Sequence, residues 1–417
     1  MKTRAQTATL DPQASSAPSK PESPWSFGWQ STYVWQKKPS FPALYSGANS
    51  LVPSPELSYS FTATGFIKYK PWVEGEFELH PEAAQGVPLS RLTGLGGLSN
   101  AELARTSGAD LTIYRARAFY RHRMGPNWVF TGGNFSALDV FDGNDFAHDP
   151  RTNFLNWTFL THGAWDYPAD ARGYSWGGSV EYLGKDWSLR FGRFLLPKES
   201  NGLRLDPALF ARYGDVLEWE KPYELGRASG EGYAGKLRLL AFRNTTRMGS
   251  FDEASKLGLA TGTVPDLANT REMRSKVGVG VNVQQQLGNN LGAFLRWSWA
   301  DGKSETYAFT EIDSSLSFGA VLKGVAWGRA QDTLGFAAAA NRISSARQTY
   351  LAAGGQGFFL GDGRLNYAPE RIYELIYQFR VSKTLSLALD YQRISAPAYN
   401  RDRGPASLLG LRVHIEQ

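Results

Sequence analysis

The sequence of 417 residues predicts an all-β fold, a sixteen-stranded antiparallel transmembrane β-barrel with short periplasmic turns and long extracellular loops. Three observations lead to this prediction. Aromatic residues make up 13% of the chain, and its 13 Trp, 19 Tyr and 24 Phe are more than a soluble helical protein normally carries. No apolar run approaches the ~20 residues that a membrane-spanning helix needs. Many short segments alternate apolar and polar residues, as strands between lipid and water do.

The strands are recognised by alternation with a period of two residues. In residues 58–70, the side chains of Tyr59, Phe61, Ile67 and Tyr69 share one face. A soluble sandwich would have to expose such an aromatic face, whereas a barrel turns it toward lipid. The sixteen expected strands are 25–36, 58–70, 72–83, 111–123, 128–136, 172–183, 186–195, 214–222, 233–245, 274–286, 290–301, 314–326, 331–342, 370–381, 384–395 and 405–417.

The lengths of the connections give an independent argument for the barrel. Short links alternate strictly with long ones, as an even-stranded barrel with both termini in the periplasm requires. The segment 157–165 also resembles a strand, but a seventeenth strand would break this alternation, so we place it in a loop. The long connections are 37–57, 84–110, 137–171, 196–213, 246–273, 302–313, 343–369 and 396–404.

The chain divides into a flexible N-terminal arm, residues 1–24, and a barrel domain, residues 25–417. The arm is rich in Ser, Pro, Ala and Gln, a composition typical of disordered segments. It lacks the apolar stretch of a secretory signal, so we expect that a leader has been removed from a protein of the bacterial outer membrane. The absence of Cys suits passage through an oxidising compartment, and the modest net charge of +6 argues against nucleic-acid binding.

Two rows of charged residues form the first candidate site. The expected strand 72–83 carries carboxylates on its polar face, and the next strand, 111–123, carries arginines. Because these strands are successive, we expect the rows to be neighbours in the wall, where Arg forks can hydrogen-bond the hydroxyl groups of a solute. The alternative is that the charges only pair with each other and hold the wall. The expected pore-lining residues are Arg115, Arg117, Arg121, Glu74, Glu76, Glu78, Arg190, Arg238 and Arg296.

The connection 137–171 is the second candidate site. It is longer and richer in paired charges than a loop without a task usually is. We expect it to fold inward and narrow a channel, and the alternative is an ordered external lid. The spacing of Asp142, Asn144 and Asp145 resembles a fragment of a calcium loop, but the glycine and the terminal glutamate are not in register, so we expect no metal. The expected constriction residues are Asp142, Asp145, His148, Asp149 and Arg151.

Three matches to enzyme motifs are discounted, and we expect neither catalytic residues nor a cofactor. The run GYSWG at 173–177 matches the nucleophile elbow of lipases, which needs a turn between a strand and a helix. Here Ser175 opens an expected strand instead. Gly230, Gly232 and Gly235 fit a dinucleotide fingerprint, and Gly235 with the following Lys236 nearly fits a phosphate loop. A strand follows both motifs where a helix must begin.

A series of short motifs gives the chain a family resemblance. The order of these motifs over about residues 27–415 makes the match specific. They include TYVWQ at 32–36, SYSFTAT at 58–64, GNFS at 133–136, HDPRT at 148–152, DARGYSWG at 170–177, GDGRLNY at 361–367 and DRGP at 402–405. On these residues the chain resembles the carbohydrate-selective porins of the OprB family.

The resemblance implies an outer-membrane porin through which monosaccharides such as glucose diffuse passively, past a constriction lined by arginines and carboxylates. The alternative is a porin for small organic or aromatic carboxylates, which would use the same arginines but discriminate by charge. The implied partners are the small solute, outer-membrane lipid and lipopolysaccharide, and we expect a monomer or a homotrimer. One departure from such barrels is the C-terminus, which reads Ile415-Glu416-Gln417 in place of a final aromatic residue.

Overall fold

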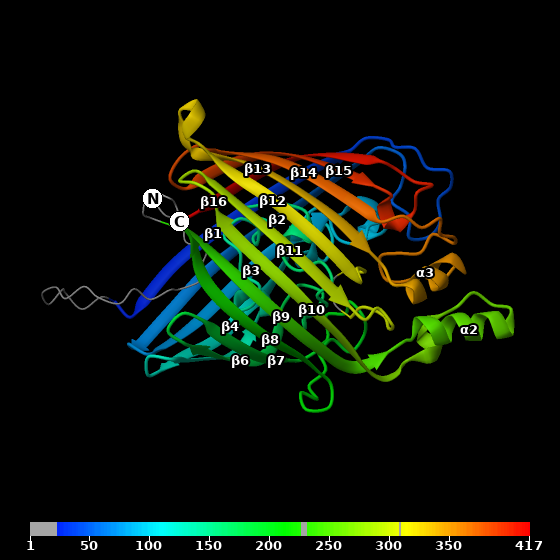
Figure 1. Ribbon diagram of the computed structural model, residues 1–417, viewed down its shortest axis with the longest axis horizontal. Helices are drawn as coiled ribbons and strands as arrows, with labels where there is room; N and C mark the ends of the chain where they lie inside the picture. The colour runs from blue at the N-terminus through cyan, green and yellow to red at the C-terminus, as the bar shows by residue number, and fades with distance from the viewer. Residues whose placement is uncertain (1–22, 227–231, 308–309) are drawn as a thin grey trace, which may run out of the picture.

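The computed structural model describes residues 23–226, 232–307 and 310–417. Within these residues, sixteen antiparallel strands form one closed barrel, in which β1 pairs with β16 (Figure 1). The predicted fold class is confirmed. Residues 1–22 of the expected arm and Gly230 of the discounted glycine motif lie outside the described residues. None of the described helices has the length and apolar character that crossing a membrane requires.

Each strand pairs with its neighbours in sequence. The strands are β1 (Trp25–Lys38), β2 (Glu56–Trp72), β3 (Gly75–Val87), β4 (Thr112–Met124), β5 (Trp128–Phe135), β6 (Ser175–Leu183), β7 (Ser188–Phe194), β8 (Tyr213–Leu225), β9 (Tyr233–Met248), β10 (Glu272–Gln286), β11 (Leu291–Ala300), β12 (Ser314–Gly324), β13 (Arg329–Arg342), β14 (Glu370–Arg380), β15 (Leu385–Ser395) and β16 (Ala406–Glu416). All sixteen expected strands are present. β6 starts later than expected because Gly173 donates its N–H to the carbonyl of Asp170 and has φ +98°, so the chain turns there.

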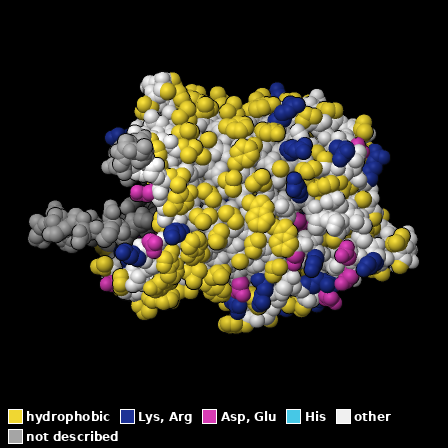
Figure 2. All heavy atoms as spheres, in the orientation of Figure 1, with side chains coloured by type: hydrophobic (Ala, Val, Ile, Leu, Met, Phe, Trp, Pro, Cys, Tyr) yellow, Lys and Arg dark blue, Asp and Glu magenta, His cyan; other side chains and the backbone are white. Residues whose placement is uncertain are grey.

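The alternation of residues places apolar side chains outside the barrel and polar ones inside. On β1, Trp29 and Tyr33 are 44% and 38% exposed, whereas Thr32 and Gln36 point inward and are buried. Figure 2 shows the same arrangement on one face of the molecule, where hydrophobic side chains spread over the middle of the wall. Such a band matches the hydrocarbon layer of a membrane.

The two ends of the barrel differ. Both termini and the short turns lie at one end, and the long connections gather at the other with the helices α2 (Phe251–Thr261) and α3 (Ser345–Ala352) (Figure 1). The end with long connections is the extracellular one in barrels of this kind. The segment 157–165 lies in a connection, as expected, and contains the short helix α1 (Trp157–Leu160).

A β-bulge interrupts the pairing of β3 with β4. His80 pairs with Arg117, but the next residue, Pro81, pairs with Arg115, so Ala116 has no partner in the register. One extra residue reverses the faces of all side chains beyond it. Arg115 therefore points outward, where its guanidinium lies 5.0 Å from the ring of the exposed Trp176. The expected row of arginines on one face of β4 is corrected at this position.

Candidate functional site

Residues 136–174, which connect β5 to β6, lie inside the barrel and are called the inner loop below. They hydrogen-bond to strands on opposite sides of the wall: Arg151 reaches Glu82 on β3, and Asn144 reaches Asn282 on β10. Between the inner loop and the wall lies a cavity of about 820 Å³. The loop and the cavity together are the candidate site.

Asp142 is the centre of the contact between the inner loop and β8, β10 and β11. Its backbone N–H donates to Glu218 Oε2 (2.6 Å), and its carboxylate accepts from Arg296 Nε (3.2 Å) and from the hydroxyl of Thr161 (2.7 Å). The residue is fully buried and has φ +55°, a conformation that Asp tolerates better than most residues. Burial alone would raise the pKa of this carboxyl, but the nearby Arg296 holds it below its usual range.

His162 fits into the wall beside Asp142. Its Nε2 lies 3.3 Å from Asp142 Oδ1, and the ring packs against Gly280 on β10, where an added Cβ would come within 2.6 Å of Nε2. Burial lowers the pKa of His162 to about 4, so the ring is neutral at pH 7. Glycine in the strand is thus required by the close approach of the loop.

Arg151 ties the inner loop to the opposite part of the wall. Its guanidinium donates to Glu102 (2.8 Å), to Glu82 on β3 (2.9 Å) and to Thr64 on β2 (3.1 Å). All the partners are buried. Each of the three guanidinium nitrogens therefore makes a hydrogen bond that holds the loop in place.

The last strands hold the middle of the inner loop. Glu374 on β14 accepts the N–H of Asn156 (3.0 Å), and Arg412 on β16 donates to the carbonyls of Pro150 (2.7 Å) and Asn153 (2.6 Å). The inner loop is thus fixed around most of the circumference of the barrel.

The cavity is lined by arginines that are already paired with carboxylates. Arg117 on β4 forms a bidentate pair with Asp139 of the inner loop (2.6 and 2.7 Å), and Arg121 pairs with Glu76 across β3 and β4 (3.1 Å). Basic side chains outnumber acidic ones in the lining. Its other acidic and basic members are Lys68, Lys70, Glu78, Arg105, Asp145, Asp149, Arg151, Arg172, Arg190, Glu220, Arg238, Lys323, Arg380 and Glu416, and the histidines His80, His148 and His414 also line it.

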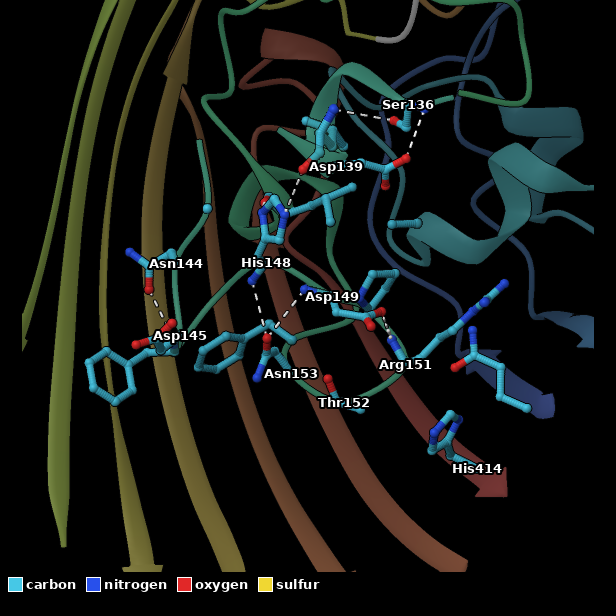
Figure 3. A pocket seen from close by; sticks show the side chains of 18 of the residues that line it. Ser136, Asp139, Asn144, Asp145, His148, Asp149, Arg151, Thr152, Asn153 and His414 are labelled. Carbon is cyan, nitrogen blue, oxygen red and sulfur yellow. Dashed lines mark hydrogen bonds between the residues drawn. The ribbon is translucent and has the colours of Figure 1, made fainter. Parts of the chain in front are cut away.

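Figure 3 shows the surface of the inner loop that borders the cavity. Asn153 accepts the backbone N–H groups of His148 and Asp149 (both 3.2 Å), and Asp149 accepts that of Arg151 (2.9 Å). His414 on the wall stands opposite this turn (Figure 3). The predicted residues His148, Asp149 and Arg151 are therefore close together, but most of their hydrogen bonds stabilise the loop itself.

The structure corrects the placement of several predicted residues. Glu74 lies in the exposed turn between β2 and β3, Arg115 points outward, and Arg296 and Asp142 are buried against each other, away from the cavity. The alternating pattern alone would place these side chains in the lumen. The turn changes the position of Glu74, the bulge reverses the face of Arg115, and the docked loop covers Arg296. The predicted residues that border the cavity are Arg117, Arg121, Glu76, Glu78, Arg190, Arg238, Asp145, His148, Asp149 and Arg151.

The lining residues that were not predicted include Asp139, Glu220 and Arg172. Glu220 alternates with Trp219 on β8 and pairs with Arg238 on β9 (2.6 Å), so the alternation contained the signal for it. Asp139 and Arg172 lie in the inner loop, where no period marks the inward direction. Arg172 has no described Asp or Glu within ion-pair distance.

The motifs for other chemistry have structural explanations. Ser175 is buried at the start of β6, and its hydroxyl donates to the carbonyl of Leu195 (2.8 Å). Asp142, the first residue of the calcium-like fragment, binds Arg296. Among the described residues, no group of three His, Asp or Glu side chains is arranged to hold a metal ion.

Comparison with known proteins gives both a family and structural relatives. The profile of the family described as "Carbohydrate-selective porin, OprB family" matches residues 69–416. The high-pH structure of OprB from Pseudomonas putida superimposes with a TM-score of 0.72 at 18% identity, covering 94% of each chain. Its low-pH structure gives a TM-score of 0.52 at 14% identity, covering 94% of this chain and 92% of that one.

A more distant structure shares the same architecture. Salmonella typhi OmpF, solved in complex with daunomycin, gives a TM-score of 0.52 at 8% identity and covers 94% of this chain and 97% of its own. At such identities, the solved structures show the fold alone. No curated protein matches the chain.

The family profile covers most of the sequence, and the closed barrel with an inner loop is the architecture of an outer-membrane channel. The chain therefore belongs to the OprB family of carbohydrate-selective porins, which are channels of the bacterial outer membrane and not enzymes.

Proposed function

We propose that the protein lets monosaccharides such as glucose diffuse inward through the cavity beside the inner loop. The observation that carries this proposal is the lining of preformed Arg–carboxylate pairs, above all the bidentate pair of Arg117 with Asp139. A guanidinium donates hydrogen bonds to a sugar hydroxyl and a carboxylate accepts them, so each pair matches a group that is both donor and acceptor.

The pairing of charges favours neutral polyols. An Arg whose charge is balanced by a neighbouring carboxylate attracts an anion less than a lone Arg does. The rings of Phe66 and Phe146, which also border the cavity, offer apolar faces for the carbon skeleton of a sugar. Several weak contacts of this kind allow a solute to enter and also to leave.

The inner loop sets the width of the passage in this proposal. Arg117 on the wall contacts Asp139 on the loop at the border of the cavity, and Arg105, Tyr167 and Arg172 border the same space. A loop held by buried ion pairs is a stiff boundary, so size selection rests on a fixed opening.

A porin for small organic or aromatic carboxylates is the second candidate. It is favoured by the excess of basic side chains in the lining and by Arg172, whose guanidinium forms no ion pair with a carboxylate among the described residues. Such a channel would prefer anions and would be blocked by a carboxylate at concentrations at which glucose has no effect.

Single-channel conductance in planar bilayers tests the proposal. Glucose is titrated first, then benzoate, on the parent protein and on Arg117→Gln. We expect saturable block by glucose and roughly tenfold weaker block in the variant, the loss of one or two charge-assisted hydrogen bonds. Arg115→Gln is the matched control, because Arg115 lies two residues away on the same strand but faces outward.

The two candidates give opposite results. Block by benzoate alone, together with a strong anion preference, would move the function to carboxylate uptake. If Arg115→Gln and Arg117→Gln weakened the block by glucose equally, glucose would not bind in the cavity beside Asp139.

A further inference from the structure

Four basic side chains stand on the outer surface of the barrel near its loop end, and we call them the rim cluster: Lys37 on β1, Arg342 on β13, Arg371 on β14 and Arg393 on β15. All four are exposed, and each lies within three residues of the extracellular end of its strand. In Figure 2, basic side chains stand over the upper right of the barrel, where Figure 1 places β13–β15.

The strand register shows that the cluster faces outward. Arg393 pairs with Tyr373, which is 44% exposed on the outer surface, and Arg371 pairs with Ser395. Arg371 and Arg393 are therefore diagonal neighbours on adjacent strands, roughly 7–8 Å apart in ordinary sheet geometry. Two guanidinium groups at this spacing can reach one phosphate or two adjacent ones.

The rim cluster has no acidic counterpart. Among the described residues, no Asp or Glu lies within ion-pair distance of any of its four members. The acidic residues of the extracellular half of β14 and β15 are Glu370, Glu374 and Asp390, and all three are buried on the inner face.

The extracellular part of β7–β10 is different. There, Arg193 on β7 pairs with Asp215 on β8 (2.7 Å), and Arg274 on β10 pairs with Glu272 (2.8 Å). In the lower right of Figure 2, basic and acidic side chains accordingly mix. Exposed basic side chains without acidic partners are thus a feature of one part of the rim and not of the whole protein.

We propose that the rim cluster binds the phosphate groups of a phosphorylated glucosamine lipid of the outer leaflet, the lipid A class. Cations on the lipid-facing wall are tolerated only near the interface, where anionic headgroups lie. Guanidinium forks match phosphate oxygens, and the exposed Tyr373 and Tyr391 place amphipathic rings at headgroup level. The site lies on the outer face, so it does not depend on which solute passes through the cavity.

Native mass spectrometry of the detergent-solubilised protein tests this assignment. The probes are lipid A, its dephosphorylated form and phosphatidylglycerol, and the variant is Arg371→Gln combined with Arg393→Gln. We expect binding of lipid A to weaken by roughly tenfold or more, because two charge-assisted hydrogen-bonding groups are removed. The matched control is Arg243→Gln, which removes an outward arginine on β9 beside Tyr213, opposite Asp215.

Each outcome decides the proposal. Selective loss of lipid A binding in the double variant, with the control unchanged, supports it. Equal binding of lipid A and its dephosphorylated form would overturn it, as would equal affinity in parent and double variant. Binding of phosphatidylglycerol as tight as that of lipid A would overturn the choice of glycolipid. Glucose permeability of the double variant, measured in parallel, verifies that the barrel is folded.

Discussion

Two kinds of ion pair occur inside this barrel, and they differ in exposure rather than in chemistry. Asp142 and Arg296, which join the inner loop to β11, have side chains that are 0% and 1% exposed. Glu76 and Arg121, which border the cavity, are 13% and 29% exposed. The first pair is sealed from water and the second is in contact with it.

The difference separates two tasks that the same residue types perform. A buried pair is costly to break, because its partner is left charged in a poor solvent. A pair in contact with water contributes little to stability but keeps its donors and acceptors available to a solute. We therefore assign the buried pairs to holding the inner loop and the cavity pairs to the passage of solute.

The largest expected effect is that of Asp142→Ala. The substitution leaves Arg296 buried without its carboxylate and should cost about 3–5 kcal/mol of stability in the region where the loop docks. Single-channel conductance should rise as the loop leaves the lumen, and denaturant unfolding in micelles should shift to lower concentration. Asp145→Ala is the control, because Asp145 is exposed and accepts a hydrogen bond from Gln284. Similar changes in both variants would contradict the special role of Asp142.

The next effect is that of Gly280→Ala, which tests the fit between loop and wall. The new methyl group would lie 2.6 Å from His162 Nε2, and the buried ring has little room to move, so we expect a loss of about 1–3 kcal/mol. Unfolding by guanidinium chloride, followed by Trp fluorescence, measures it. Gly132→Ala on β5 is the matched control, since an added Cβ there meets nothing within 4 Å. A neutral result for Gly280→Ala would mean that the loop is held more loosely than the structure indicates.

An effect of similar size should follow from acidification. Burial lowers the pKa of His162 to about 4, below the usual 6.5, in a site that also contains Asp142 and Arg296. Between these values the unfolded chain binds a proton that the folded chain does not, so stability falls as the pH falls from 6.5 toward 4. The contribution is about 1.4 kcal/mol for each pH unit in this window.

Hydrogen exchange at the amides of Thr161, His162 and Ala164 measures this effect between pH 7 and pH 5. After correction for intrinsic exchange rates, protection should decrease toward pH 5 in the parent. In His162→Asn the decrease should be flatter. An equal slope in both proteins would assign the pH dependence to other groups.

The smallest expected effect on stability is that of Glu76→Gln. This carboxylate pairs with Arg121 in contact with the cavity, so its loss should change stability by less than about 1 kcal/mol. The reversal potential in a salt gradient should nevertheless shift toward anions, since an unbalanced arginine then borders the passage. A large loss of stability without a change in selectivity would reverse the two tasks assigned above.

Much of the fold follows from sequence patterns that are local. Alternation locates every strand, and the alternation of long and short links gives the parity and the direction of the barrel. The same reasoning places Arg121, Glu76 and Arg190 on the lumen side, where they border the cavity. The register between β2 and β3 shifts close to Glu76, but Glu76 still pairs directly with Arg121 on β4.

The remainder depends on information that a period of two residues does not contain. The unpaired Ala116 reverses the face of Arg115, and the pattern of arginines on β4 looks the same with or without it. Arg296 alternates like a lumen residue, but Asp142, which lies 154 positions away, covers it. Contacts between the inner loop and distant strands decide which lumen residues meet water.

The grip of β14 and β16 on the inner loop also constrains how the molecule is assembled. The carbonyls of Pro150 and Asn153 accept hydrogen bonds from Arg412, which lies 262 and 259 positions later in the chain. Contacts over such separations form late in folding. The inner loop therefore gains these contacts only when β16 is in place. We expect closure of the barrel and docking of the inner loop to be completed together. A chain that ends before β16 would lose both the pairing that closes the barrel and the Arg412 contacts that position the inner loop in the channel.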